Sequence, residues 1–479
     1  EANPSAKTAT AQGDSSNPSN SRFSLAGWLE EQFTSLATIA RRASEMPATR
    51  SPAEFEKTEN RAASAVEKPA RPPTAPMASP FDRHSAVQKG VLVVTRSHEG
   101  PDEFGSLAEA CRAAKSGEAI ELRYNGALDS RPIYLTGQRL TIRAGDGFAP
   151  IVNFRPRDTD LAQSHSMIVL GGGQLTLISV QLELAVSRQA VGESLALGEM
   201  RPGESIRLEN CVLTIRNAAD SKLAYQPDVA FFEIRAVPGA GVMTMKDGGP
   251  MMRPAAALQL KNCIARGEAL FIRANDAQPA QIGWENGLLA TSERFLTSLG
   301  GPSDPRPPGQ IQIDLRHLTA FVAGGFVSLS ATQDAPLQLP VEVNASDCIF
   351  LTKKGAAAAP LVDQSGVEDP EDLRKRIAWN GDRNFYEGFS VFWRMAGPGG
   401  AETAVQMNLT DWQGFWGSHE VRPTADRVVW RQLPPADRAV NLHVPGDYAL
   451  GSGENAARAA ASDGRDAGAE IDQLPVVKE

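Results

Sequence analysis

The sequence of 479 residues lacks several features that mark large functional classes. Basic residues are in the minority, because 48 Lys and Arg stand against 57 Asp and Glu. The resulting net charge of −9 gives no basic field for nucleic acid or anionic lipid. The most apolar stretch, 167–186, is interrupted by Gly, Gln and Glu and does not qualify as a membrane span. We therefore expect a chain that neither binds nucleic acid nor crosses a membrane.

Residues that commonly bind metals or act in catalysis are also sparse. The four cysteines include no pair separated by two residues, and the six histidines are scattered, so no zinc pattern is present. Asp158 and Asp160 are the nearest local pair of carboxylates, but we expect them in a solvated loop rather than a hydrolase site. The His-Arg-Asp and Asp-Phe-Gly motifs of protein kinases are absent. We predict no metal, no cofactor and no catalytic residue, and leave open whether the chain is an enzyme.

The two ends of the chain differ in composition from its middle. Residues 1–23, rich in Ser, Ala, Asn and Thr, predict a disordered arm, and residues 45–89 predict a linker rich in Pro and Ala. Residues 451–479, rich in Gly, Ala and Asp, predict a disordered tail. Apolar residues recur every three or four positions over 24–44, which predicts an amphipathic helix. This helix either docks on a protein domain or binds a membrane surface or partner, and its acids favour docking.

Short runs of alternating apolar and polar residues fill the region 90–450, with Gly, Asn, Asp and Pro between them. Such runs are typical of half-buried strands, so we expect this region to be almost entirely β. One helix is expected near its start, where Leu107, Ala110, Cys111 and Ala114 have helical spacing. We expect that helix to cover the open end of the β-structure.

A repeated segment within this region determines the expected fold. Each copy has two apolar positions two residues apart, then a polar or small corner residue, then a small or apolar residue. Copies recur at intervals of roughly 30 residues, stretching to roughly 50 where longer excursions intervene. The six copies are 140–145, 175–180, 206–211, 258–263, 313–318 and 343–348.

Repeats of this length stack on one another, because a single copy cannot close a core. Strands joined by corners, with no room for crossover helices, predict the coils of a parallel β-helix. A β-sandwich would instead show hairpin signals every 8 to 12 residues or so, and a propeller would show about four strands in each 40 to 45 residues. Neither alternative fits the repeat as well.

Stacked coils bring equivalent positions to within ~4.8 Å, so the repeat also predicts columns of like side chains. We expect polar corner residues to hydrogen-bond along the stack and cysteines to fill an interior column as free thiols. A disulfide between two stacked cysteines is the alternative, although parallel side chains disfavour it. A histidine at a corner is expected to be a hydrogen-bonded member of the stack rather than a general base. The predicted structural ladder comprises Asn210, Cys211, Asn262, Cys263, His317, Asp347 and Cys348.

Five of the seven tryptophans crowd into the last quarter of the β region. Exposed aromatic rings stack on sugars or anchor protein partners. Aromatic residues also cover the unpaired edge of a final coil, and for this reason we expect a C-terminal cap at residues 375–448. The candidate binding residues are Trp379, Arg383, Tyr386, Trp393, Trp412 and Trp416.

Several stretches resemble a known family. Residues 117–126 and 140–147, and the later stretches 317–320 and 379–386, are similar to coils of the right-handed β-helices of the pectate-lyase superfold. More particularly, they resemble the β-helix regions appended to bacterial serine/threonine protein kinases. The resemblance covers about 90–450 and implies an extracytoplasmic sensing or binding region. It also implies that a kinase domain and a membrane span lie upstream of Glu1.

Together these features predict an all-β protein. Its fold is expected to be a right-handed parallel β-helix with an N-terminal capping helix, preceded by the disordered arm and the amphipathic helix. We predict that it presents a non-catalytic surface for a polysaccharide or protein ligand. The alternative is a polysaccharide lyase or glycoside hydrolase acting on an acidic polysaccharide, and a purely structural spacer is a third possibility.

Overall fold

The computed structural model describes residues 90–478, with gaps at 98–99, 101, 162–163, 187–193, 218–224, 237–253, 303–308, 354, 356–358, 399 and 401–402. The chain divides into two compact units, Glu1–Arg83 and His84–Glu479, and all described residues belong to the second. The predicted arm, amphipathic helix and linker, at 1–23, 24–44 and 45–89, lie outside the described residues.

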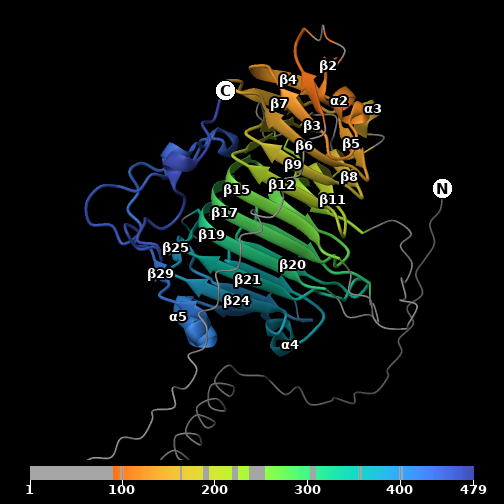
Figure 1. Ribbon diagram of the computed structural model, residues 1–479. Helices are drawn as coiled ribbons and strands as arrows, with labels where there is room; N and C mark the ends of the chain where they lie inside the picture. The colour runs from red at the N-terminus through yellow and green to blue at the C-terminus, as the bar shows by residue number, and fades with distance from the viewer. Residues whose placement is uncertain are drawn as a thin grey trace, which may run out of the picture. The chain divides into compact units, whose positions relative to one another are not determined.

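The described residues form a solenoid of stacked coils with two long sheets, sheet A and sheet B (Figure 1). A typical coil contributes one strand to sheet B and two strands to sheet A, which are separated by a corner. Within the described part of the chain, neighbouring strands pair in parallel, except for β26 and β27. The predicted fold class, an all-β parallel β-helix, is therefore confirmed.

The strands fall into three groups along each coil. Sheet B contains β5 Ile133–Thr136, β8 Ser166–Gly171, β11 Leu195–Met200, β14 Val229–Ile234, β16 Leu270–Ala274, β18 Leu296–Leu299, β20 Val327–Ser330, β23 Val362–Ser365, β26 Trp393–Ala396 and β27 Val405–Met407. The pre-corner strands of sheet A are β1 Val91–Val94, β2 Glu103–Phe104, β3 Ala119–Leu122, β6 Arg139–Ala144, β9 Gln174–Ile178, β12 Ser205–Glu209, β21 Val341–Ser346, β24 Ile377–Asp382 and β28 Glu420–Val421. The post-corner strands are β4 Gly126–Ser130, β7 Pro150–Phe154, β10 Gln181–Ala185, β13 Val212–Arg216, β22 Ile349–Leu351, β25 Phe385–Glu387 and β29 Thr424–Ala425. Three strands run through the corner and belong to both groups, namely β15 Ala256–Gly267, β17 Ala280–Thr291 and β19 Ile311–Val322.

Equivalent apolar side chains lie in single file inside the solenoid. Leu208 pairs with Leu260, Leu260 with Trp284, and Trp284 with Leu315, and all four side chains are buried. This stacking follows from the alternation in the repeat, because every second residue of a strand points into the coil. The predicted column of apolar side chains is therefore present, and it contains one coil more than the repeat predicts.

The additional coil is the one around Trp284, which the repeat did not reveal. Its strand β17 pairs with β15 in parallel and forms a coil of its own. A tryptophan fits where its neighbours have leucine because Gly287 stands where the preceding coil has Cys263. A Cβ on Gly287 would overlap the Trp284 indole and come within 2.9 Å of the Cys263 carbonyl. Trp284 stands where the other copies have a smaller apolar residue, and Gly287 stands where most of them have a larger side chain. The repeat is therefore not recognisable in the sequence at this coil.

Helices cover the solenoid locally. The expected N-terminal helix is α2 Leu107–Ala113, whose N-cap Ser106 accepts a hydrogen bond from the Glu109 amide. The predicted loop at Asp158 and Asp160 is instead a short helix, α3 Asp158–Leu161. Near the other end lie α4 Pro370–Arg374 and α5 Leu409–Trp416. The remaining short helices are η5 Gly417–His419, η6 Val440–Leu442, η7 Pro445–Tyr448 and η8 Ile471–Gln473. No helix in the described part of the chain is long and apolar enough to cross a membrane.

The C-terminal segment, residues 451–478, contradicts the prediction of a disordered tail. It returns along the solenoid from its last coils, and the chain ends beside β4 and β7 (Figure 1). Gln181 contacts the backbone of Val476 and Lys478 near its end. The small side chains Ala457 and Ala467 are fully buried against the post-corner strands. A segment rich in Gly and Ala is therefore ordered here because the surface beneath it is apolar.

Candidate functional site

Corner residues of successive coils share one unusual backbone conformation. Their φ values lie between 49° and 57°, in the left-handed region that Asn and Asp tolerate better than most residues. Strand register places them in one file, which we call the corner column. It consists of Ser179, Asn210, Asn262, Asn286, His317, Asp347, Arg383 and Arg422. Asn286 donates to the Asn262 side chain at 3.0 Å, so part of the column is hydrogen-bonded along the stack.

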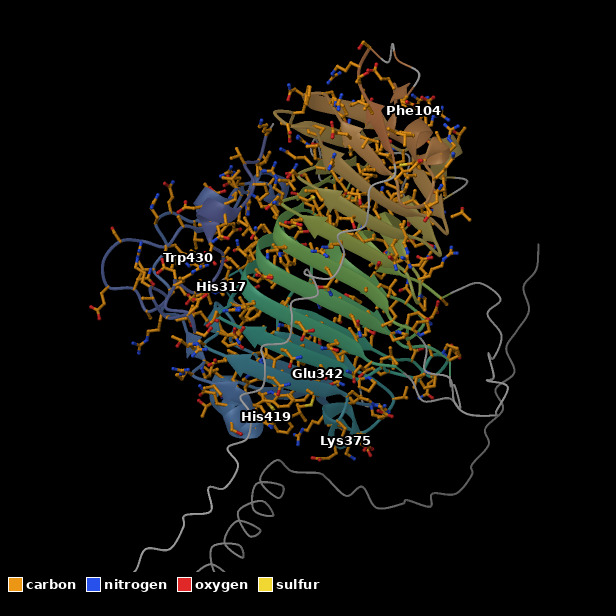
Figure 2. All side chains as sticks on the ribbon, viewed as in Figure 1. Phe104, His317, Glu342, Lys375, His419 and Trp430 are labelled. Carbon is orange, nitrogen blue, oxygen red and sulfur yellow. The ribbon has the colours of Figure 1, made fainter. Side chains whose placement is uncertain are left out.

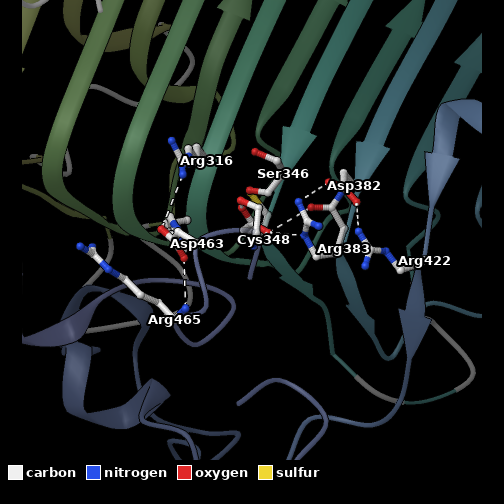
Figure 3. Close-up of polar contacts among 12 residues, drawn as sticks. Arg316, Ser346, Cys348, Asp382, Arg383, Arg422, Asp463 and Arg465 are labelled. Carbon is white, nitrogen blue, oxygen red and sulfur yellow. Dashed lines mark hydrogen bonds and ion pairs between the residues drawn. The ribbon is translucent and has the colours of Figure 1, made fainter. Parts of the chain in front are cut away.

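Lower in the column, the side chains bind the C-terminal segment as well as one another. His317 contacts Asp463 and Gly468, and Asp347 accepts hydrogen bonds from the Ser462 amide at 2.7 Å and the Arg383 side chain at 3.0 Å. Figure 3 shows Arg383 beside Asp382 and Asp463 beside Arg316. Arg383 was a candidate binding residue, but it braces this corner.

The predicted cysteine column is present, and its thiols are free. Cys211 and Cys263 occupy equivalent positions of adjacent coils, and both are completely buried. All four cysteines are unpaired, so the disulfide alternative is not realised. Burial raises the pKa of Cys111 and Cys348 to about 12, which excludes an activated thiolate at either position.

The aromatic candidates form a cap rather than a binding surface. Trp379, Tyr386, Trp393 and Trp412 are each at most 1% exposed, so their rings offer no face to a ligand. Trp416 is partly buried and stacks on Trp393 with ring centroids 5.8 Å apart. The physical reason is the end of the stack, where the last coil would otherwise leave its interior open to water.

The cap encloses a carboxylic acid that the sequence did not single out. Glu420 lies opposite Gly381, whose missing side chain leaves room for the carboxyl group. Trp412 Nε1 donates to it at 3.3 Å and Tyr386 Oη at 3.2 Å. Burial raises the pKa of Glu420 to about 7, although these hydrogen bonds favour the charged form. It is a titrating structural group inside the cap.

Sheet B presents a row of charged side chains on its outer face, and this is the strongest candidate site. Glu199, Glu233 and Arg273 occupy matched positions of β11, β14 and β16. Residues beside them pack into the interior, such as Phe232 and Ile234 around Glu233, so the three charged side chains point outward. All three are nevertheless less than 10% exposed. We call Glu199, Glu233, Arg273 and the neighbouring Asn275 the charged face.

Arginines tie the two carboxylates of the charged face together. Arg201 Nη2 lies 3.0 Å from Glu199, and Arg235 lies 3.2 Å from Glu233 and 3.8 Å from Glu199. On the other side, Asn275 Nδ2 donates to Glu233 Oε1 at 2.7 Å. Glu233 Oε1 thus has two partners, from neighbouring strands of the same sheet.

Three buried polar atoms at this place have no hydrogen-bond partner among the described residues. They are Glu233 Oε2, Arg273 Nη1 and Asn275 Oδ1. Arg273 Nη1 lies 3.7 Å from Glu233 Oε1, too far for a hydrogen bond, while Nη2 of the same side chain pairs with Asp228. Buried polar atoms are nearly always paired in folded proteins, so two acceptors and one donor without partners among the described residues make this place a candidate site for a polar ligand, although all three atoms are covered in this structure.

The row continues along the same face of sheet B. Thr297 and Ser328 follow Arg273 in register, and Asp363 and Arg394 come next. Arg394 forms two hydrogen bonds with Asp363, at 2.9 and 2.7 Å, and Arg294 adds a third at 3.2 Å. Polar groups thus extend along the sheet for several coils, at the ~4.8 Å spacing of stacked strands.

The charged face was not predicted from the sequence, because its residues lie far apart along the chain. Its signal is a single charge inside an otherwise apolar strand, as in 195–200, 229–234 and 270–274. Only the register shows that these charges are neighbours. Asp160 proves to be a local cap that accepts from the Arg157 amide at 3.1 Å. Among the described residues, no three His, Cys, Asp or Glu side chains are grouped so as to hold a metal ion.

Comparisons with known proteins add little to this picture. No family model and no curated protein matches the chain. The chain is similar to a solved structure of a point mutant of pectin methylesterase in complex with a hexasaccharide, with 12% sequence identity and a TM-score of 0.33. The match covers 74% of this chain and 92% of that one. The fold assignment here rests on strand register, and the association with a kinase stays a prediction.

Proposed function

We propose that this β-helix is a non-catalytic binding protein whose charged face takes up a carbohydrate. The proposal is carried by one observation, namely that the buried atoms Glu233 Oε2, Arg273 Nη1 and Asn275 Oδ1 have no partner in the described part of the chain. A sugar hydroxyl can donate to either oxygen and accept from the guanidinium, and neighbouring hydroxyls can do both at once. A chain of sugars can continue along the sheet toward Thr297 and Ser328. A protein ligand would need polar side chains in the same arrangement.

The alternative is a glycoside hydrolase that uses Glu199 and Glu233. One observation favours it, because Arg235 reaches both carboxylates and the two residues are paired in adjacent coils. Such an enzyme needs one carboxylic acid that holds a proton until it protonates the leaving group. Both carboxylates are instead engaged by arginine side chains, which leaves neither of them free to contact a leaving group. Binding without turnover is therefore the better-supported function.

The cellular setting is also a proposal. The resemblance of 117–126 and 140–147 to kinase-linked β-helices supports an extracytoplasmic region of a membrane-anchored protein. The upstream coding sequence is the decisive test. A kinase domain followed by an apolar span there would support this setting, and their absence would remove it.

The binding proposal is tested with the full chain on a glycan array, followed by calorimetry with the glycan that binds best. We expect Glu233→Gln to weaken binding about tenfold or more, in line with the loss of a charged hydrogen bond. Glu183→Gln is the matched control, because Glu183 also pairs with an arginine, Arg216, but on another face. Equal binding by all three proteins, or no glycan bound by any, would refute the proposal. Release of new reducing ends would instead favour the hydrolase.

A further inference from the structure

The C-terminal segment lies against the corner column and is held there partly through its main chain. Asp347 accepts a hydrogen bond from the Ser462 amide at 2.7 Å, and His317 contacts the Gly468 carbonyl oxygen at 3.2 Å. Figure 2 shows His317 on the side of the solenoid where this segment lies. Residues of the corner column therefore bind peptide groups.

Side-chain amides make this kind of contact with both of their polar ends. Asn286 Oδ1 accepts a hydrogen bond from the Glu470 amide at 2.8 Å, and Nδ2 of the same side chain lies 3.4 Å from the Glu470 carbonyl oxygen. Gln181, just after the corner of its coil, accepts from the Lys478 amide and donates to the Val476 carbonyl oxygen, both at 3.4 Å. A carboxamide carries an acceptor and two donors, so it can bind the N–H and the C=O of a peptide chain together.

Ser179 and Asn210 occupy equivalent corner positions, but their side chains have no such partner. Their φ values are 56° and 52°, as in the rest of the column, and neither side chain forms a hydrogen bond with another described residue. Both line a hollow of about 300 Å³ between the corners of sheet A and residues 473–478, which we call the corner hollow. Val212 belongs both to its lining and to the apolar face that the C-terminal segment covers. The corner hollow therefore continues the surface on which the chain binds its own C-terminal segment.

The rest of the lining offers apolar surface and one positive charge. Phe148 and Val476 line the corner hollow and are 38% and 77% exposed, so their side chains are available to a ligand. Lys478 also lines it and forms no ion pair within the described part of the chain. Its ammonium group is therefore available to an acidic group of a ligand.

We propose that the corner hollow binds an extended peptide segment of a partner protein. Asn210 binds the main chain of that peptide, as Asn286 binds the main chain of the C-terminal segment. An apolar side chain of the partner lies against Phe148 and Val476, and an acidic side chain pairs with Lys478. Main-chain hydrogen bonds supply affinity, and the lining selects the side chains. A peptide is the favoured occupant because the adjoining corners already bind one.

Panning of a phage-displayed library of random peptides on the full chain tests this proposal and supplies the probe. The most enriched peptide is synthesised, labelled with a fluorophore and titrated with wild type and variants. Asn210→Gly removes the carboxamide, and glycine adopts the left-handed corner conformation without strain. We expect this variant to bind the peptide about tenfold more weakly, in line with the loss of two neutral hydrogen bonds. Asn262→Gly is the matched control, because Asn262 has the same corner conformation but does not line the corner hollow, and it should bind as wild type does.

Two further measurements test the main-chain contact and the charge. Methylation of each peptide amide in turn should reveal one N–H whose loss weakens binding to wild type but not to Asn210→Gly. Lys478→Glu changes an exposed side chain and should weaken binding about threefold or more. Glu233→Gln, on sheet B, should leave peptide binding unchanged, so this site and the glycan site are tested separately. A library that yields no binding peptide, or a peptide bound equally well by wild type and Asn210→Gly, would overturn the proposal.

Discussion

Two outer faces of the same solenoid differ in the side chains that they present and in what covers those side chains. On the post-corner strands, Val212, Ile264 and Leu288 point outward in one file, and the C-terminal part of the chain covers them through Tyr448 and Leu474. On sheet B, the outward row from Glu199 to Arg394 is charged or polar, and its arginines and carboxylates pair with neighbouring charged residues. The apolar outer face is covered by the C-terminal part of the same chain, whereas the charged face has buried polar atoms for which the described residues supply no partner.

This contrast separates structural from functional surface. The apolar face is a packing surface, because covering it requires only shape and hydrophobicity. The charged face needs a hydrogen-bonding partner with matched donors and acceptors, which the described residues do not supply at Glu233 Oε2 and Arg273 Nη1. The two faces therefore predict different responses to mutation.

Removal of residues 451–479 should have the largest effect. It would expose the apolar file of the post-corner strands, so we expect the free energy of unfolding to fall by several kcal/mol and the protein to self-associate. Thermal unfolding and light scattering measure both effects. Val476→Ser, at a side chain that is 77% exposed, is the control and should behave as wild type. A truncated protein that stayed monomeric and equally stable would contradict the claim that the C-terminal segment covers an apolar face.

The interior of the solenoid lies behind both faces. We expect its stability to be sensitive to substitution at Gly287 and Trp284. Gly287→Ala places a Cβ against the Trp284 indole and the Cys263 carbonyl, so we expect a loss of about 1 to 3 kcal/mol from overpacking. Trp284→Leu should restore part of that loss in the double variant, since leucine is the residue of the neighbouring coils. Chemical denaturation of the four proteins gives the coupling energy. Additive effects would contradict the assigned packing.

The cap should make stability depend on pH through Glu420. The pKa of this residue is about 7 in the folded protein and 4.5 when unperturbed, so the folded state holds an extra proton between these values. Its contribution is complete below pH 4.5 and is lost as the pH rises toward 7, by up to about 3 kcal/mol. Denaturant unfolding of wild type and Glu420→Gln at pH 5 and 8 tests this. Unchanged pH dependence in the variant would count against it.

The smallest effect is expected on sheet B beside the charged face. Thr297 is half-buried on the outer face, and Thr297→Ala should change the free energy of unfolding by less than about 0.5 kcal/mol. The contrasting substitution is Leu288→Ala on the apolar face, which should cost about 2 to 5 kcal/mol. Similar losses at the two positions, measured by denaturant unfolding, would mean that the faces do not differ as described.

The fold could be predicted from the sequence because its repeat is local. Two apolar positions followed by a polar corner, as in 206–211 and 258–263, specify a coil without knowledge of its neighbours. The coil at Trp284 escaped detection because its fit depends on Gly287, which is meaningful only once the two are known to touch.

The ordered C-terminal segment and the charged face required long-range information. The segment has no periodicity of its own, and its signal lies elsewhere, in neighbouring apolar pairs such as Val212 with Leu213 and Leu288 with Leu289. Such pairs are apolar on both faces of a strand and imply a cover. The charged face depends on the register of three strands separated by long excursions, and composition does not encode that register.

The central claim is that sheet B carries the binding surface and the covered face does not. Hydrogen–deuterium exchange with and without the glycan that binds best on the array tests it most directly. We predict new protection in 195–200, 229–234 and 270–275, and none in 212–216 or in the cap helix 409–416. Protection confined to the post-corner strands or to the cap would contradict the account.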